Sequence, residues 1–163
     1  MAHIEDEEYT YVQPPVVEFV AKCMYPDRRN ANGIYYPREV IEKAVAEFQS
    51  KINQNIAVGE LNPTYIVGEF THPSTNLDRV SHKITSLSIG EECCVAEGVT
   101  LNTPLGKILQ QLLTEDCTVG INPCIMATVS NENVLDIDAK IIRFDIAGIS
   151  SFDNDDNRIS LKE

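Results

Sequence analysis

The sequence predicts an α+β domain, with a mostly antiparallel sheet or barrel of about seven or eight short strands and two main helices. Three observations lead to this fold class. Short runs rich in β-branched residues outnumber helical stretches along the 163 residues. Only two segments repeat apolar residues at helical spacing. Strands and helices do not alternate, as they would around a parallel sheet.

The two helices are marked by a first-turn proline and an apolar face. Pro37 opens the first, which we expect to run to about Lys51 with a face of Val40, Ile41, Ala44, Val45 and Phe48. Thr103 and Pro104 supply an N-cap and a first-turn proline for the second. Its apolar positions are Leu105, Ile108, Leu109 and Leu112, and it should end near Glu115.

The strands are short and bounded by turn residues. We expect them over residues 16–24, 56–58, 65–70, 80–89, 93–99, 119–121, 125–129, 134–137 and 140–146. In the segment that begins at Val80, the apolar alternation through Ile84 changes phase at Leu87, which predicts a bulge near residues 85–86. His82 then lies on the inward face, where its ring needs hydrogen-bond partners.

Charge and length limit the partners. We expect one domain over residues 15–149, an acidic arm over 1–14 and an acidic, solvated tail over 150–163. The formal net charge of −12 makes nucleic acid and anionic membranes poor partners. No apolar run is long enough to span a bilayer, and the acidic start lacks a signal-peptide pattern, so we expect a cytoplasmic protein.

No cofactor or metal is expected. The five cysteines form an odd number without a C-x-x-C spacing, which is typical of buried thiols in a reducing compartment and not of a zinc site or disulfide framework. The acidic run 153–157 begins like a calcium loop, but Arg158 stands where the turn glycine belongs.

Two of the three histidines, His72 and His82, fall close together in the sequence. Imidazoles exchange protons near neutral pH, so a pair suggests general-base chemistry if a nucleophile lies within reach. The segment where we would look for that nucleophile reads Asn122-Pro123-Cys124 and contains no serine.

In this order, the segments resemble the prohead core (scaffold) maturation proteases of tailed phages, which share the assemblin-like fold of herpesvirus capsid proteases. The matching stretches include Asn-Gly-Ile-Tyr-Tyr-Pro before a helix and Gly-Glu-Phe-Thr-His-Pro. The full set is 32–37, 68–73, 76–84, 103–109, 119–121, 144–146 and 150–152. Together they span most of residues 30–152 in collinear order.

The resemblance implies roles for several residues. It makes His72 the general base, vestigial or active, and His82 a possible second histidine; a buried histidine satisfied by backbone is the other interpretation of His82. Family members carry a nucleophilic serine in a turn where this chain has Asn122 and Pro123. A carboxamide is no useful nucleophile, and proline lacks the N–H that an oxyanion hole needs.

Three interpretations of this segment follow. In the first, which we favour, the site is catalytically dead and the fold serves a structural role. In the second, Cys124 replaces the serine and pairs with His72, although a shift of two residues on a strand moves the sulfur by about 6–7 Å. In the third, Ser130 or Ser150 is the nucleophile.

The leading functional hypothesis is therefore a protease-fold phage structural or head-assembly protein, present in the host cytoplasm during assembly and then in the virion. Its expected partners are other phage head or neck proteins and further copies of itself, bound through the acidic surface. The alternative is an active prohead protease that cleaves scaffold and capsid precursors, often after Glu in this family, with His72 as base.

Overall fold

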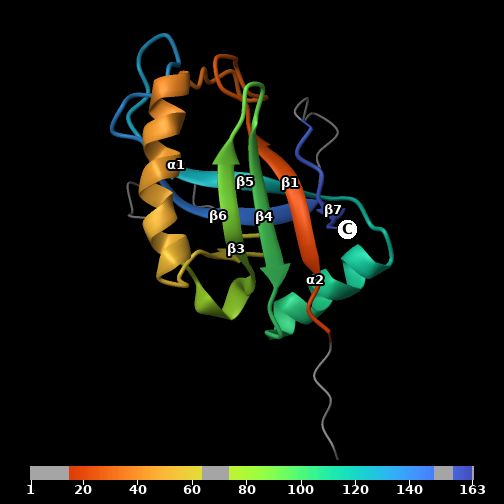
Figure 1. Ribbon diagram of the computed structural model, residues 1–163. Coiled ribbons are helices and arrows are strands. Elements are labelled where there is room, and N and C mark those ends of the chain that lie inside the picture. The colour runs from red at the N-terminus through yellow and green to blue at the C-terminus, as the bar shows by residue number, and fades with distance from the viewer. Residues whose placement is uncertain (1–14, 64–73, 149–155, 163) are drawn as a thin grey trace, which may run out of the picture.

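The computed structural model describes residues 15–63, 74–148 and 156–162 of the chain (Figure 1). These residues form two helices and seven strands, all paired antiparallel within the sheets, which confirms the α+β prediction. The strands are β1 (Glu18–Met24), β2 (Val58–Glu60), β3 (Val80–Ile89), β4 (Cys94–Thr100), β5 (Val119–Met126), β6 (Lys140–Gly148) and β7 (Ser160–Leu161); the helices are α1 (Arg38–Asn53) and α2 (Pro104–Thr114).

The strands make two sheets that pack across one core. The larger has the order β2-β3-β4-β1-β7, and β5 and β6 form the smaller one, which crosses the larger sheet in Figure 1. A parallel bridge between Leu61 and Ile146 joins the sheets at one edge. At the other edge, residues 157–161 pair first with β5 and then with β1. The described strands therefore approach a closed barrel.

Helix α1 covers one open side of this barrel, against β3 and β6 (Figure 1). All five residues of its predicted apolar face are buried. Phe48 meets Phe144 of β6 edge to face, with ring centroids 5.2 Å apart, which is a favoured aromatic geometry. The helix prediction is confirmed.

Helix α2 begins as predicted, but it is rotated from the predicted face. Thr103 caps it by accepting a 2.9 Å bond from the Gly106 N–H. Gly106 packs so closely on the preceding loop that a Cβ there would lie 1.8 Å from the Leu101 carbonyl oxygen. This contact turns the Gly106 side of the helix inward, so Leu109 is fully buried and Ile108 is 50% exposed. The predicted helix is present, but Ile108, one of the apolar positions that marked it, lies outside the core.

The predicted bulge in β3 is present. The register with β4 shifts between Ile84 and Ser86, which face Gly98 and Glu97 respectively. The extra residue keeps both Ile84 and Leu87 buried. His82, which precedes the bulge, points inward as predicted and is fully buried.

The segment around Pro123 differs from the prediction. We expected two strands separated by a turn at 122–124, but β5 is continuous. The Ile121 N–H faces the edge that pairs with Asn157, so the Pro123 nitrogen, two residues on, faces the same edge beyond the end of that pairing. Among the residues that the structure describes, none bonds at that edge position, and proline is tolerated on such an edge.

Two other expectations also change. Residues 134–137 form no strand, because the chain after β5 makes a hairpin with a single bridge between Val129 and Leu135, and Val134 bridges Tyr35 instead. In the expected tail, the described residues pack on the barrel, with Asn157 and Ile159 buried. The arm 1–14 and the strand expected over 65–70 lie outside the described residues.

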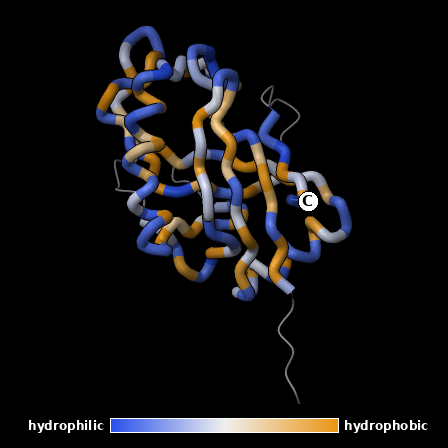
Figure 2. Tube along the Cα trace, in the orientation of Figure 1, coloured by the Kyte–Doolittle hydropathy of each residue, from blue (hydrophilic) through white to orange (hydrophobic). Residues whose placement is uncertain are grey.

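The core lies between the two sheets and α1. Figure 2 shows apolar stretches gathered along the strands and polar stretches along many of the connections. The largest fully buried apolar side chains of the core are Phe19, Phe48, Phe144, Ile41, Leu109, Ile121 and Ile146. Among the described residues, no helix has the length and apolar character needed to cross a membrane.

Candidate functional site

The structure places the predicted site residues on two sheets. Asn122, Pro123 and Cys124 lie in the middle of β5, and His82 lies on β3. His72 lies outside the described residues, as do Glu69 and Ser150. Both ring nitrogens of His82 are engaged elsewhere, so the structure does not pair this imidazole with Cys124.

His82 is fully buried and has two short hydrogen bonds. Its Nε2 lies 2.7 Å from the Phe144 carbonyl oxygen, and its Nδ1 lies 2.7 Å from the Ser81 hydroxyl. A carbonyl only accepts, so Nε2 carries the proton and Nδ1 accepts from Ser81. Burial lowers the pKa of His82 to about 4. The ring is therefore neutral near pH 7, and Ser81, itself fully buried, is closed to substrate.

Gly59 of β2 makes this contact possible. A Cβ at this position would lie 1.9 Å from the Phe144 oxygen and 2.4 Å from His82 Nε2. Both are far inside van der Waals contact, so only glycine fits where the ring reaches across to β6. Three residues from separate strands thus meet at one crossing point between the sheets.

The outer edge of β6 is capped by donors from three different elements. The carbonyls of Ile142, Phe144 and Ile146 accept from Lys51 Nζ, His82 Nε2 and the Asn62 N–H respectively. The Lys51 bond is 2.8 Å long, and burial lowers the pKa of its ammonium group. These three carbonyls of β6 are consequently satisfied without a full neighbouring strand.

The face of β5 and β6 that carries the predicted site is strongly polar. Asn122 lies opposite Asp145, and Cys124 lies opposite Arg143. Directly opposed residues of an antiparallel pair share a face. Asn122 is exposed and Cys124 is half-buried, whereas the two charged partners are buried.

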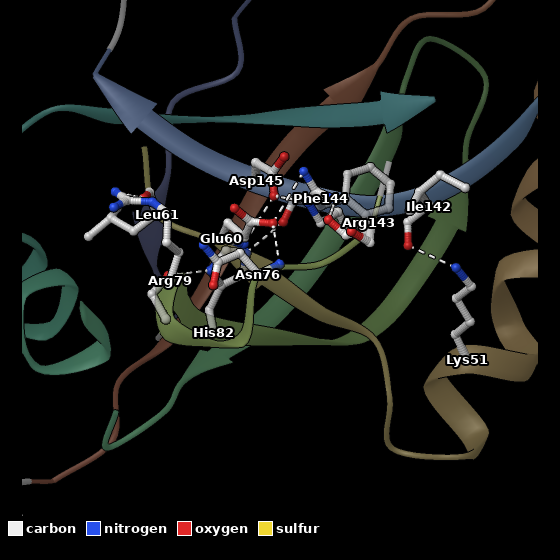
Figure 3. Close-up of polar contacts among 12 residues, drawn as sticks. Lys51, Glu60, Leu61, Asn76, Arg79, His82, Ile142, Arg143, Phe144 and Asp145 are labelled. Atoms are coloured by element: carbon white, nitrogen blue, oxygen red, sulfur yellow. Dashed lines mark hydrogen bonds and ion pairs between the residues drawn. The ribbon is translucent and has the colours of Figure 1, made fainter. Parts of the chain in front are cut away.

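Beneath this face lies a buried ionic cluster (Figure 3). The Arg143 guanidinium contacts Asp145 at 2.8 Å and Glu60 at 3.3 Å, and all three side chains are at most 5% exposed. The carboxylates also accept backbone bonds of 3.0 Å, Asp145 from the Glu60 N–H and Glu60 from the Asn76 N–H. Each charge therefore has both an ionic partner and hydrogen-bond support.

Arg143 and Asp145 were not among the site residues predicted from the sequence. The available signal was two opposite charges, two residues apart, in an otherwise apolar strand. Such charges share a face and are rarely buried unless paired. Glu60, the third member, comes from a distant strand and had no comparable signal.

The electrostatics of the site do not activate the thiol. Burial raises the pKa of Cys124, and Arg143 only partly offsets this because Asp145 and Glu60 act in the same direction as burial. For Arg143, burial alone would lower the pKa, but Asp145 and Glu60 together raise it. The guanidinium stays charged while the thiol stays protonated near neutral pH, and a protonated thiol is a weak nucleophile.

Asn122 is held in place by residues from the far end of the chain. Asn157 Nδ2 donates to Asn122 Oδ1 at 3.1 Å and to the Ile121 carbonyl at 3.0 Å. Beside Asn122 and Pro123 is a cavity of about 90 Å³, walled on its far side by the end of β1 and the loop around Asn30. Within the described part of the chain, no group of three or more potential ligands could hold a metal ion.

Comparisons with known proteins support the fold. No family model matches the sequence, and no curated protein matches it. Among solved structures, the chain is similar to the capsid assembly protease of bacteriophage T4, gp21, at a TM-score of 0.65 and 16% identity. The similarity covers 84% of this chain and 85% of that one. At this level of identity it establishes a shared fold.

Gly59→Ala should destabilise the protein by at least about 3 kcal/mol, because the new methyl group overlaps a backbone oxygen and a buried ring. Chemical denaturation followed by circular dichroism measures the loss. Gly148→Ala is the matched control, since a Cβ there meets nothing within 4 Å. Equal stability of the two variants would contradict the crossing geometry.

Arg143→Met should cost about 3–5 kcal/mol of unfolding free energy, because it leaves two buried carboxylates without their cation. Lys43→Met is the control: its ion pair with Glu47 is exposed, and such pairs contribute at most about 1 kcal/mol. Urea titrations of both variants give the difference. A loss at Arg143 no larger than at Lys43 would show that the cluster is not buried as described.

His82 should make the protein less stable in acid. The unfolded imidazole takes up a proton near pH 6.5 and the folded one only near pH 4, so the unfolded state binds more protons between these values. Stability should fall by about 3 kcal/mol as the pH is lowered through this window. The comparison is with His82→Gln, which should lack this component of the pH dependence. Parallel curves for the two proteins would contradict a neutral, buried His82.

Proposed function

We propose that this chain is a catalytically silent protein with the fold of a phage capsid assembly protease, acting as a structural or head-assembly component. The similarity to the T4 capsid assembly protease supports the fold part of this proposal. The state of the segment 122–124, where the family resemblance expects the nucleophile, supports the rest.

The observation that carries the proposal is that Asn122, Pro123 and Cys124 belong to a β-strand, whose register with β6 shifts only after Cys124. Each of the three residues pairs in register with β6, and the Asn122 carboxamide oxygen accepts from Asn157. Position 122 offers no hydroxyl, and position 123 offers no N–H for an oxyanion. Acyl transfer needs both a nucleophile and such donors.

The neighbouring groups do not restore activity. Cys124 is the nearest thiol in sequence, but its pKa is raised by burial. His82 donates a hydrogen bond from Nε2 to a backbone carbonyl, and its Nδ1 accepts one from a buried hydroxyl. Ser130 caps its own hairpin turn by accepting from the Val134 N–H at 3.1 Å. None of these described residues forms a nucleophile and base pair open to a substrate.

In this role the chain acts by binding. A net charge of −12 favours docking on basic protein surfaces by electrostatic complementarity. The partners we propose are other phage head or neck proteins and further copies of the chain. The place of action is the host cytoplasm during head assembly and afterwards the virion.

The test is a cleavage assay on the purified full chain. Scaffold and major capsid precursors of the phage that encodes it are incubated with wild type, His72→Ala and Cys124→Ser, and products are read by mass spectrometry. We expect no cleavage above background from any of the three. Fluorophosphonate labelling of the same samples should likewise mark no serine.

Cleavage that is lost in His72→Ala would overturn the proposal and make the chain an active protease; loss in Cys124→Ser as well would identify the thiol as nucleophile. A labelled Ser130 or Ser150 would point to a displaced serine. Quantitative mass spectrometry of purified virions tests the structural role separately. Absence from both virions and assembling proheads would contradict it.

A further inference from the structure

The segment that closes the barrel between β1 and β5 is made of residues 156–162, here called the closing strand. Its backbone bonds to β5 on one side, through Ile121 N–H to Asn157 and Ile159 N–H to Val119, at 3.0 and 2.9 Å. On the other side it bonds to β1, where the Lys162 N–H donates to the Glu18 carbonyl at 3.0 Å. One extended segment thus fills a slot between two strands of different sheets.

The slot recognises two side chains of the closing strand. Asn157 and Ile159 point inward and are 7% and 9% exposed, while Arg158 and Ser160 between and after them point outward. Asn157 additionally donates through Nδ2 to β5, at the Ile121 carbonyl. The slot therefore contacts the side chains at positions 157 and 159, an asparagine and an isoleucine separated by one outward residue.

The other contacts of the closing strand are few; they include hydrogen bonds from the Tyr25 hydroxyl to the Asp156 carbonyl and from Asn157 Nδ2 to Asn122 Oδ1. Its ladder with β1 is only two residues long, and Leu161 is 48% exposed. Its ion pairs, Lys162 with Glu97 and Arg158 with Asp156, lie on the surface, where such pairs contribute little. A short segment with few buried contacts belongs to the part of a fold that opens most easily.

We propose that the closing strand is exchangeable, and that the slot between β1 and β5 accepts the same segment from a second copy of this chain. Opening exposes unpaired edges of β1 and β5, which favour a new strand as partner. The segment from another copy makes the same contacts as the chain's own segment, so exchange requires no new interface.

Protein concentration decides whether the slot holds the chain's own closing strand or that of a second copy. Within one molecule the closing strand benefits from a high effective concentration, which favours the closed monomer in dilute solution. Crowding many copies together removes this advantage. Exchange should therefore appear as the protein concentration rises. This inference rests on the closing strand alone and does not depend on whether the chain is an enzyme.

The first test uses a fluorescent peptide with the sequence of residues 156–162 and the full chain. In Ile159→Ser the chain's own strand is weakened while the slot is intact, so the peptide should bind about tenfold or more tighter than to wild type, as expected for truncation of one buried aliphatic side chain. A peptide carrying the same Ile159→Ser change should bind neither protein. Ser160→Ala, an outward position, is the matched control and should behave as wild type.

Equal binding of the peptide to wild type and Ile159→Ser overturns the proposal, and so does equal binding of the two peptides. Unfolding of Ile159→Ser, seen by circular dichroism, overturns it too, because a separable strand leaves the remaining barrel folded. Arg158→Ala, also outward, repeats the control at a second position.

The second test identifies the occupant. Isotope-labelled and unlabelled full chains are mixed at rising concentration and examined by native mass spectrometry. Mixed dimers that increase with concentration, and that excess peptide suppresses, are expected. Peptide binding without any dimer up to about 1 mM, the effective concentration of a short linker, would overturn the assignment to a second copy and leave a segment of another protein as the occupant.

Discussion

The hydrogen bond from His82 Nε2 to the Phe144 carbonyl is the contact on which the arrangement of the two sheets depends. It is 2.7 Å long, fully buried, and made across a gap that only Gly59 leaves open. A buried strand edge with an unpaired carbonyl would be costly. The imidazole satisfies it from the neighbouring sheet, so β6 needs no second full partner strand. Neutrality of the ring is part of this design, because a charged imidazole would have to be solvated inside the core.

The contact between His82 and the Phe144 carbonyl also positions the candidate site. Strand β6 takes its outer-edge bonds from His82, Lys51 and Asn62, and along its inner edge it pairs with β5. That pairing sets Asn122 opposite Asp145. A residue that the family resemblance suggested as a second catalytic histidine therefore acts, in this structure, as a support for the strand next to the site. Its two hydrogen bonds leave no nitrogen free to serve a nucleophile.

Much of this fold could be predicted from local patterns. The first helix, the cap of the second and the bulge in β3 each follow from residues close together in the sequence. The prediction failed where distant contacts decide. Pro123 by itself predicts a turn, and only the place where the closing strand begins, opposite Ile121, explains why a strand tolerates it. The rotation of α2 depended on the packing of Gly106, and the partner of Arg143 depended on which strand lies beside β6. Neither the packing of Gly106 nor the neighbour of β6 can be read from the spacing of residues along one segment.

The ionic cluster supports the scaffold independently of the residue at position 122. Well-packed apolar residues can be as stabilising as a buried ion pair, so stability alone is a weak reason to keep Glu60, Arg143 and Asp145. Their position gives a better reason. A slip of β6 by one residue would turn both of its charges into the apolar core. The cluster therefore fixes the register of β6 against β2 and β5, and it does so whether position 122 holds a nucleophile or an asparagine. Because the polar support beneath the site also fixes the register of β6, the residue at position 122 can differ without removing any part of the structure on which folding depends.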